Sequence, residues 1–395
     1  MLGEEELLKE SEKRIFSLGL GDTASTLSYL NMRYGIAKII HVLRSYGIDK
    51  TETFSLLGPD ATITRNYDRW MSGFGYGCII HWPGKKYDKI IFPEVRPNAC
   101  GMILAILNEA LSDAEILEMI YETKKMDLCV NGVSIKWDLN KGNHFIEVLS
   151  VKWSRLDSIP EGSLLALIHT SASEIKHLLY NFENYEGTWE ETPFGKCYVL
   201  EGKEAKKYYN QYRKLEAFSE KKRKLLLAEI FGDCNIICNP IHQGLFDANV
   251  MRLGVYDSTD KSTCSLNAPL FPLALGWDLP VILIRGYPNL SQGTVERLRF
   301  QERAEELGLE EFIKYVNVLP HGGGYTLNTS CKEVKAVQIK NSRYFKILAK
   351  DRTFILSNPR EVPYTYRGME VLQKIEECAL GEPLAEFKQV CSFKV

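Results

Sequence analysis

Histidine is scarce in this chain of 395 residues, and four of its seven histidines sit where a loop meets an apolar run. They occur in GNHFIEV, ALIHTSAS, NPIHQG and LPHGGGY, as His144, His169, His242 and His321. A single histidine at a strand end is usually a hydrogen-bonded core residue. Several imidazoles beside a thiolate instead suit zinc, manganese, iron or cobalt. Cys100, in a tight turn of small residues, is the best candidate thiol, although spacing alone leaves open whether these groups meet.

A glycine-rich segment, Pro320 to Gly324, places His321 beside three residues without side chains. Main-chain N–H groups of such a segment can approach a phosphate or an oxyanion closely. The alternative is an ordinary glycine-rich turn after a strand. HGGG also resembles the oxyanion loop of α/β-hydrolases, but no G-x-S-x-G nucleophile elbow follows it. A GxxxxGK[ST] phosphate loop is likewise missing from the sequence, which argues against the common ATPase class.

The elements that must position these residues follow from hydrophobic spacing. Residues 4–47 predict two helices, the second with Asp22 as N-cap, and 111–125 predict another. Residues 51–104 alternate glycine, proline and aromatic clusters, typical of short strands and loops, with Cys100 just before an apolar strand. Strand-like runs follow at VSIKWDL, HFIEVLSVKW and LLALIHTS, so that His144 and His169 fall at strand ends.

The second half of the chain opens with a strongly charged helix over 204–231, which we expect to face solvent because a run of lysines usually marks a solvated face. CNIICN and LPVILIRG then predict strands, and 295–316 predicts one helix. No internal repeat or linker divides the chain. The expected fold class is α+β, with a helical layer at 1–60 continuous with a large domain at 61–395.

Composition excludes several classes of protein. Lysine plus arginine at 49 against aspartate plus glutamate at 51 gives a formal charge of −2, so a nucleic-acid-binding groove would have to be local. The ten cysteines include no CxxC pair, which argues against a zinc ribbon and a small disulfide framework. The acidic opening does not resemble a signal peptide, and no apolar run is long enough to span a membrane. We therefore expect a cytoplasmic protein with no membrane partner.

Taken in order, the motifs resemble those of the RtcB family of GTP-dependent RNA ligases over about residues 73–395. Lys141 to Glu147 is almost verbatim the family's G-N-H-F-I-E. The weaker matches persuade by their order, and are Gly75-Tyr76-Gly77, Asn98-Ala99-Cys100-Gly101, Ile168-His169-Thr170-Ser171, Ile241-His242-Gln243, Pro320-His321-Gly322-Gly323-Gly324, Glu361 to Tyr366 and Gln389 to Lys394. The resemblance implies a single large RtcB-like domain with central sheets, a metal site in a central cleft, and added N-terminal helices.

The same resemblance implies roles for individual residues. Cys100, His144, His169 and His242 would hold one or two manganese ions, with zinc or another divalent metal as alternatives, and the thiolate would lie between the metals. His321 would attack the α-phosphate of GTP. The residues implied to bind the nucleotide are Asn143, Glu147, Gly322, Gly323 and Lys394. The implied activity is the joining of RNA 3′-phosphate or 2′,3′-cyclic phosphate ends to 5′-hydroxyl ends, in tRNA splicing or RNA repair.

The chain also departs from the family pattern. The aspartate that helps the family bridge two metals is replaced by Pro97, which removes an anionic ligand and should weaken the second metal. The basic H-R-K-G-A-T element has no counterpart between Val250 and Leu273. Arginines of two other motifs are replaced by Tyr325 and by the segment Ala172-Ser173-Glu174. Affinity for RNA ends or for triphosphate should therefore be reduced, since no neutral side chain replaces an arginine–phosphate pair.

Three functions stay open at this point. The first is a metal-dependent RNA ligase that forms a guanylyl-histidine. The second is a metal- and nucleotide-binding relative that has lost ligation and acts as a partner or sensor. The third is a metal-free fold whose histidines are core groups. An activating protein partner, the oligomeric state, and the role of the N-terminal helices are not addressed by the residue pattern.

Overall fold

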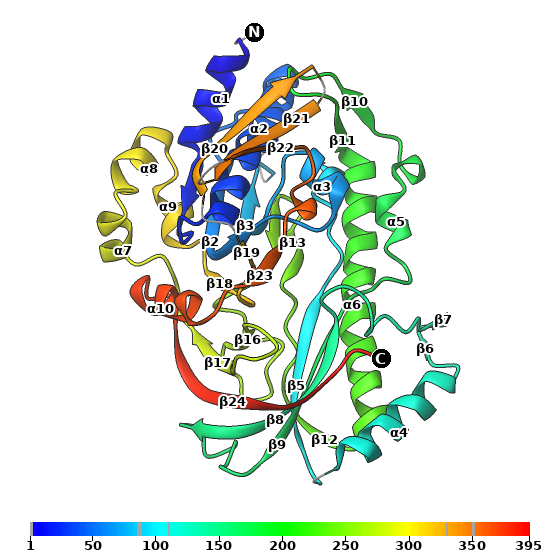
Figure 1. The fold of residues 1–395 in the computed structure, drawn as a ribbon. Helices are drawn as coiled ribbons and strands as arrows, with labels where there is room; N and C mark the ends of the chain where they lie inside the picture. The colour runs from blue at the N-terminus through cyan, green and yellow to red at the C-terminus, as the bar shows by residue number, and fades with distance from the viewer. Residues whose placement is uncertain (1–2, 85–88, 110, 329–330, 341, 350–351) are drawn as a thin grey trace.

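The computed structural model describes residues 3–84, 89–109, 111–328, 331–340, 342–349 and 352–395. Its largest sheet has seven antiparallel strands, and Figure 1 shows it in the lower half of the molecule. In spatial order these strands are β12 (Cys234–Cys238), β5 (Gly101–Leu107), β9 (Leu164–Thr170), β8 (Phe145–Ser154), β24 (Gly381–Phe393), β17 (Val281–Gly286) and β16 (Leu270–Ala274). The C-terminal strand β24 therefore lies inside the sheet, between β8 and β17.

A second sheet of five strands lies in the upper half of the molecule with the N-terminal helices (Figure 1). Its order is β1 (Ile15–Ser17), β2 (Phe54–Thr62), β3 (Tyr76–His81), β14 (Val250–Leu253) and β13 (Gln243–Asp247). The predicted helices are confirmed as α1 (Glu4–Lys13) and α2 (Thr23–Ser45). Asp22 caps α2 by accepting a hydrogen bond from the Ser25 amide. The short strand β1 between the helices was not predicted.

The lysine-rich helix α6 (Gly202–Phe231) runs along one side of the molecule between the two sheets (Figure 1). The expectation that it simply faces solvent is wrong for one face. That face buries aromatic and aliphatic side chains, including Tyr208, Phe218 and Leu226, and α6 packs against β5 and β9. Two basic residues, Lys222 and Arg223, are also fully buried on it. The sequence pattern did not reveal this amphipathic face, because exposed lysines separate its apolar positions.

The predicted helix over 295–316 is broken into three short helices, α7 (Gln292–Arg297), α8 (Gln301–Leu307) and α9 (Glu310–Lys314). The first break contains Arg299, and the second contains Gly308, both in the left-handed region of the backbone. Gly308 ends α8 as glycine commonly ends helices. The predicted helix at 111–125 is confirmed as α4 (Asp113–Lys125), with a Ser112–Glu115 capping box.

The remaining elements are short. The helical ones are α3 (Tyr67–Met71), η1 (Pro93–Val95), α5 (His177–Tyr180), η2 (Phe182–Asn184), η3 (Pro359–Glu361) and α10 (Met369–Glu377). The strands are β4 (Ile90–Ile91), β6 (Cys129–Val130), β7 (Val133–Ser134), β10 (Thr188–Glu190), β11 (Cys197–Glu201), β15 (Val255–Asp257), β18 (Val318–Pro320), β19 (Tyr325–Leu327), β20 (Cys331–Ile339), β21 (Ser342–Ala349), β22 (Thr353–Leu356) and β23 (Tyr364–Tyr366). The chain is thus a mixed α and β protein with several sheets, and the α+β prediction holds at that level.

The helical layer predicted at 1–60 is interwoven with the rest of the chain, because β2 crosses its boundary and pairs with β1 on one side and β3 on the other. The largest hydrophobic cluster joins the two main sheets, since Leu56 of β2 and Leu167 of β9 belong to it together. Among the described residues, no helix is long and apolar enough to cross a membrane.

The buried lysine of α6 gives a test of this packing. Lys222 Nζ lies 2.8 Å from Glu174 and 3.0 Å from Asp138, and all three side chains are buried. Lys222→Ala should lower the free energy of unfolding by about 3–5 kcal/mol, because it leaves two buried carboxylates without their cation. Urea denaturation measures the difference. The adjacent exposed Lys221→Ala is the control and should change it by less than about 0.5 kcal/mol. Equal effects of the two substitutions would contradict the buried network.

Candidate metal centre and adjoining cavity

Three of the predicted ligands lie at one end of the seven-stranded sheet. Cys100 directly precedes β5, His144 directly precedes β8, and His169 is the next-to-last residue of β9. Because β9 lies between β5 and β8 and is antiparallel to both, its end meets their beginnings. His169 is in register with Met102 on one side and with Phe145 on the other. Strand pairing thus brings together residues far apart in sequence.

The fourth predicted ligand, His242, comes from the loop between β12 and β13. Its amide donates to the Cys100 carbonyl at 3.0 Å, and its carbonyl accepts from Gly254 N and Val255 N. Gly101 allows the close approach, because a Cβ there would lie 2.5 Å from the Pro240 carbonyl oxygen and 2.8 Å from the Arg223 guanidinium. A small residue is therefore required after Cys100, because a side chain at Gly101 would collide with its neighbours.

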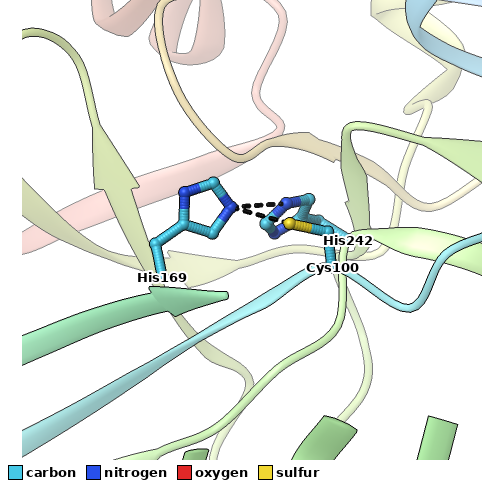
Figure 2. A group of neighbouring side chains, drawn as sticks. All are labelled: Cys100, His169 and His242. Atoms are coloured by element: carbon cyan, nitrogen blue, oxygen red, sulfur yellow. Dashed lines mark hydrogen bonds between the residues drawn. The ribbon is translucent and has the colours of Figure 1, made fainter. Parts of the chain in front are cut away.

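The side chains of Cys100, His169 and His242 point toward one another (Figure 2). Cys100 Sγ lies 2.9 Å from His169 Nε2, which lies 3.3 Å from His242 Nε2. The three donor atoms are all within 4.8 Å of one another and buried, so that the group could hold a metal ion. His144 Nε2 lies 3.8 Å from Cys100 Sγ but outside that group. Cys100 Sγ therefore lies near two imidazoles of the converging group, those of His169 and His242, and near the separate imidazole of His144.

The protonation pattern of the two central imidazoles favours a cation between them. His169 Nδ1 lies 2.9 Å from the Asn143 carbonyl oxygen and must donate its proton there, which leaves Nε2 as a bare acceptor. Burial, with nearby charge, lowers the pKa of both His169 and His242 well below the ordinary value, and so holds both rings neutral. Lone pairs that converge in a dry interior need a shared proton or a metal ion.

His144 is held from behind by a carboxylate. Its Nδ1 lies 3.2 Å from Asp138 Oδ2, and Asp138 also accepts from Thr170 and Lys222. Burial alone would lower the pKa of His144, but Asp138 and Cys100 outweigh it and raise that pKa to about 10. At that pKa the ring is protonated at neutral pH, so that a metal ion on Nε2 would have to displace a proton. Neither Asp138 nor Lys222 was singled out in the sequence, because no motif marks them.

A buried guanidinium lies beside the cysteine. Arg223 of α6 donates to Asn239 and Ser219 and packs against Gly101. Burial lowers its pKa to about 10, so that it stays protonated at neutral pH, and the charge of Cys100 acts against that lowering. Arg223 was not predicted as a site residue, because it lies among the lysines of a strongly charged helix.

His321 adjoins the metal group and is supported by an aspartate. Its ring stacks on His242 with centroids 4.2 Å apart. Nδ1 lies 2.5 Å from the Gly254 carbonyl oxygen and 3.2 Å from Asp60 Oδ2. These contacts hold the proton on Nδ1, which leaves the lone pair on Nε2. Asp60 is fully buried in β2. The only sequence signal for it is a carboxylate inside an otherwise apolar strand.

A cavity of about 110 Å³ opens beside His321. All the residues expected to bind nucleotide line it, together with the proposed nucleophile and one ligand; they are Asn143, Glu147, Gly322, Gly323, Lys394, His321 and His169. The glycines also have a packing role, since a Cβ at Gly322 would lie 2.5 Å from the Ala274 carbonyl oxygen and one at Gly323 would lie 2.3 Å from that of Arg367. The structure thus places the predicted site residues around one connected region.

Glu147 is the buried acid of this cavity. It is 4% exposed and faces Ser392 across the β8–β24 pair, and one of its oxygens has no hydrogen-bond partner. Burial raises its pKa to about 7, against the opposing charge of Lys394 and hydrogen bonds from Gln389 and Ser392. Trp277, 78% exposed, stands at the rim of the same cavity. It was not anticipated, because an isolated tryptophan in a polar loop carries no positional signal.

Comparisons with known protein families and with characterised proteins find no match to this chain. The chemistry of the site therefore follows from its own residues.

The metal group predicts how metal content depends on the thiol. Purified protein should carry close to one equivalent of a divalent transition metal, and Cys100→Ala should lower the affinity at least tenfold, because it removes the only anionic donor of the group. Elemental analysis after dialysis against defined metal measures this. Cys129→Ala, at an exposed cysteine, should retain the metal. A wild-type content below about a tenth of an equivalent would contradict the site.

The raised pKa of Glu147 predicts a pH-dependent stability. Its folded-state pKa of about 7 lies above the ordinary 4.5, so the stability it contributes is present below pH 4.5 and is lost as the pH rises toward 7. Glu147→Gln in the presence of chelator should therefore stabilise the protein by about 2–4 kcal/mol at pH 8 and by little at pH 4.5. Urea unfolding at both pH values tests this. Glu161→Gln, at an exposed position, should be neutral at both.

Proposed function

We propose that this protein is an RtcB-like RNA ligase. It would join RNA 3′-phosphate or 2′,3′-cyclic phosphate ends to 5′-hydroxyl ends, using GTP and a divalent metal, with manganese the leading candidate. Its substrates would be tRNA halves or broken RNA, and its α+β fold would be a divergent form of the RtcB domain. The observation that carries the proposal is the position of His321, between the candidate metal group and the cavity that Asn143, Glu147 and Lys394 line.

The cavity has the properties that a guanine nucleotide requires. Its volume of about 110 Å³ is several times what one water molecule needs, so that it can admit a larger group. Glu147 supplies a buried acceptor for N–H donors of a base, and Lys394 a cation beside it. Phe145 and Trp277 offer aromatic faces along the same lining. The glycines beside His321 leave the main chain open to a phosphate.

The first chemical step would use Nε2 of His321. Its lone pair attacks the α-phosphorus of GTP, a P–N bond forms, and the bond to the bridging oxygen breaks with release of pyrophosphate. The Nδ1 proton stays on the ring, held by the Gly254 carbonyl and by Asp60. That contact stabilises the positive charge that the ring gains as the P–N bond forms.

The second step would transfer the guanylate. An oxygen of the RNA 3′-phosphate attacks the same phosphorus, the P–N bond breaks, and His321 regains its neutral ring. The 5′-hydroxyl then attacks the activated 3′-phosphate and GMP leaves, which forms the new phosphodiester. A cyclic phosphate end would first be opened by water to the 3′-phosphate.

The donor set fits a borderline divalent metal. One thiolate and two imidazoles, with a third imidazole beside the thiolate, suit zinc, iron or cobalt better than magnesium, and manganese is the metal that the resemblance implies. A metal held there would polarise phosphoryl oxygens close to His321. The loss of the carboxylate at Pro97 favours one firmly held ion over two.

A second candidate is a metal- and nucleotide-binding protein without ligase activity, acting as a partner or sensor. The observation that favours it is the replacement of family arginines by Tyr325 and by the segment Ala172-Ser173-Glu174. Such a protein would bind metal and GTP but form no covalent adduct, so the experiment below separates the two functions.

Incubation with GTP labelled at the α-phosphate, in Mn²⁺, tests the proposal. We expect a protein-bound, acid-labile label that His321→Ala abolishes, since a phosphoramidate to imidazole requires that nitrogen. His177→Ala, at an exposed histidine outside the site, should label normally. A wild-type protein that takes up no label while binding metal would support the sensor instead, and an adduct that survives His321→Ala would overturn the proposed nucleophile.

A further inference from the structure

A second hollow, of about 410 Å³, adjoins the cavity of His321. The two share Tyr76, Asn143 and Tyr325 in their linings. The hollow's own residues come from the segment around α3, from the loop before β5, from the start of β13 and from η3; they are Ile63, Thr64, Arg65, Asn66, Arg69, Asn98, Gly142, Gln243 and Arg360. His321 and the glycines beside it line only the first cavity.

The hollow is cationic. Arg65, Arg69 and Arg360 line it, and no aspartate or glutamate does. Within the described part of the chain, no carboxylate pairs with any of the three. Arg69 is buried and fixed by the carbonyls of Val95 and Arg96, whereas Arg65 and Arg360 are exposed at the rim. Arg65 and Arg360 can turn planar donor pairs toward phosphate oxygens, and Arg69, whose N–H groups already bond Val95, Thr64 and Arg96, adds a fixed positive charge.

The floor of the hollow leads to the metal group. Three amide side chains line it, and each neighbours a candidate ligand: Asn98 is two residues before Cys100, Asn143 precedes His144, and Gln243 follows His242. Gln243 is 2% exposed, and its Nε2 has no hydrogen-bond partner. A buried N–H group without an acceptor costs about 1–3 kcal/mol. A ligand oxygen in the hollow would remove that cost.

We propose that this hollow binds the terminal phosphate of the RNA strand that accepts the guanylate. The identity of the strand rests on the proposed function, whereas the affinity for a phosphate does not. The nucleotide's phosphates would lie along the glycines of the first cavity, so the acceptor has to approach from another side. The hollow provides that side, next to the metal group. Arg65 and Arg360 would thereby replace the family arginines that are missing at Tyr325 and after Ser171.

Binding of two short single-stranded RNAs, identical except for a 3′-phosphate or a 3′-hydroxyl end, tests this by fluorescence anisotropy in Mn²⁺. Wild-type protein should prefer the phosphorylated end. Arg65→Ala/Arg360→Ala should reduce that preference about 10- to 100-fold, the effect of one or two charge-assisted contacts. The control, Arg155→Ala/Arg213→Ala, removes two exposed arginines outside the hollow and should keep the preference. The control variant should also take up label from GTP to the same extent as wild type.

The outcomes separate the inference from the proposed function. An end preference lost in Arg65→Ala/Arg360→Ala supports the inference even if no protein forms a guanylyl adduct, which would sink only the ligase. A preference that survives in that variant overturns the inference, whatever the adduct shows. A variant that keeps the preference but loses GTP affinity assigns the arginines to the triphosphate, and likewise overturns it.

Discussion

The convergence of a thiol and unprotonated imidazole nitrogens in a dry interior is the constraint on which the site depends. His169 Nε2 lies between Cys100 Sγ and His242 Nε2, and its own proton is held at the far nitrogen by the Asn143 carbonyl. Such a group needs a shared proton or a metal ion. Strand register, the pairing of the His242 backbone with Cys100, and the buried Asp138–Lys222 pair all serve to keep these donors in place.

The distribution of charge around the donors sets what the group can hold. The described carboxylates nearest the histidines, Asp60 and Asp138, contact His321 and His144 from behind and are not part of the converging group. Pro97, three residues before Cys100, offers no anionic ligand. Arg223 adds a fixed positive charge beside Cys100. The thiolate is then the main negative charge available, which favours a single tightly held dication on the side of His169 and His242.

Local patterns predicted the elements well and the site only in part. The cap at Asp22, the helix after Ser112 and the strand after Cys100 each follow from a few adjacent residues. Strand pairing between segments far apart in sequence brings together Cys100, His144, His169 and His242. No rule of residue spacing predicts such pairing, so only the family resemblance identified these four residues as a group. Asp60, Asp138 and Arg223 could not be found, because burial of a charged residue is decided by partners from distant segments.

Polar atoms without partners are concentrated around this region, and that concentration links folding to function. Among the described residues, those bordering the metal group or its two cavities include Asp60 Oδ1, Glu147 Oε2, His242 Nδ1, Gln243 Nε2 and Gln389 Oε1. Each costs about 1–3 kcal/mol while it stays unpaired. A folded domain is stable by only about 5–15 kcal/mol, so the seven-stranded sheet and α6 must supply the stability that the site lacks. Glu147 and Gln243 line the two cavities, where a base or a phosphate could pair with them, and ligand binding would therefore stabilise the whole chain.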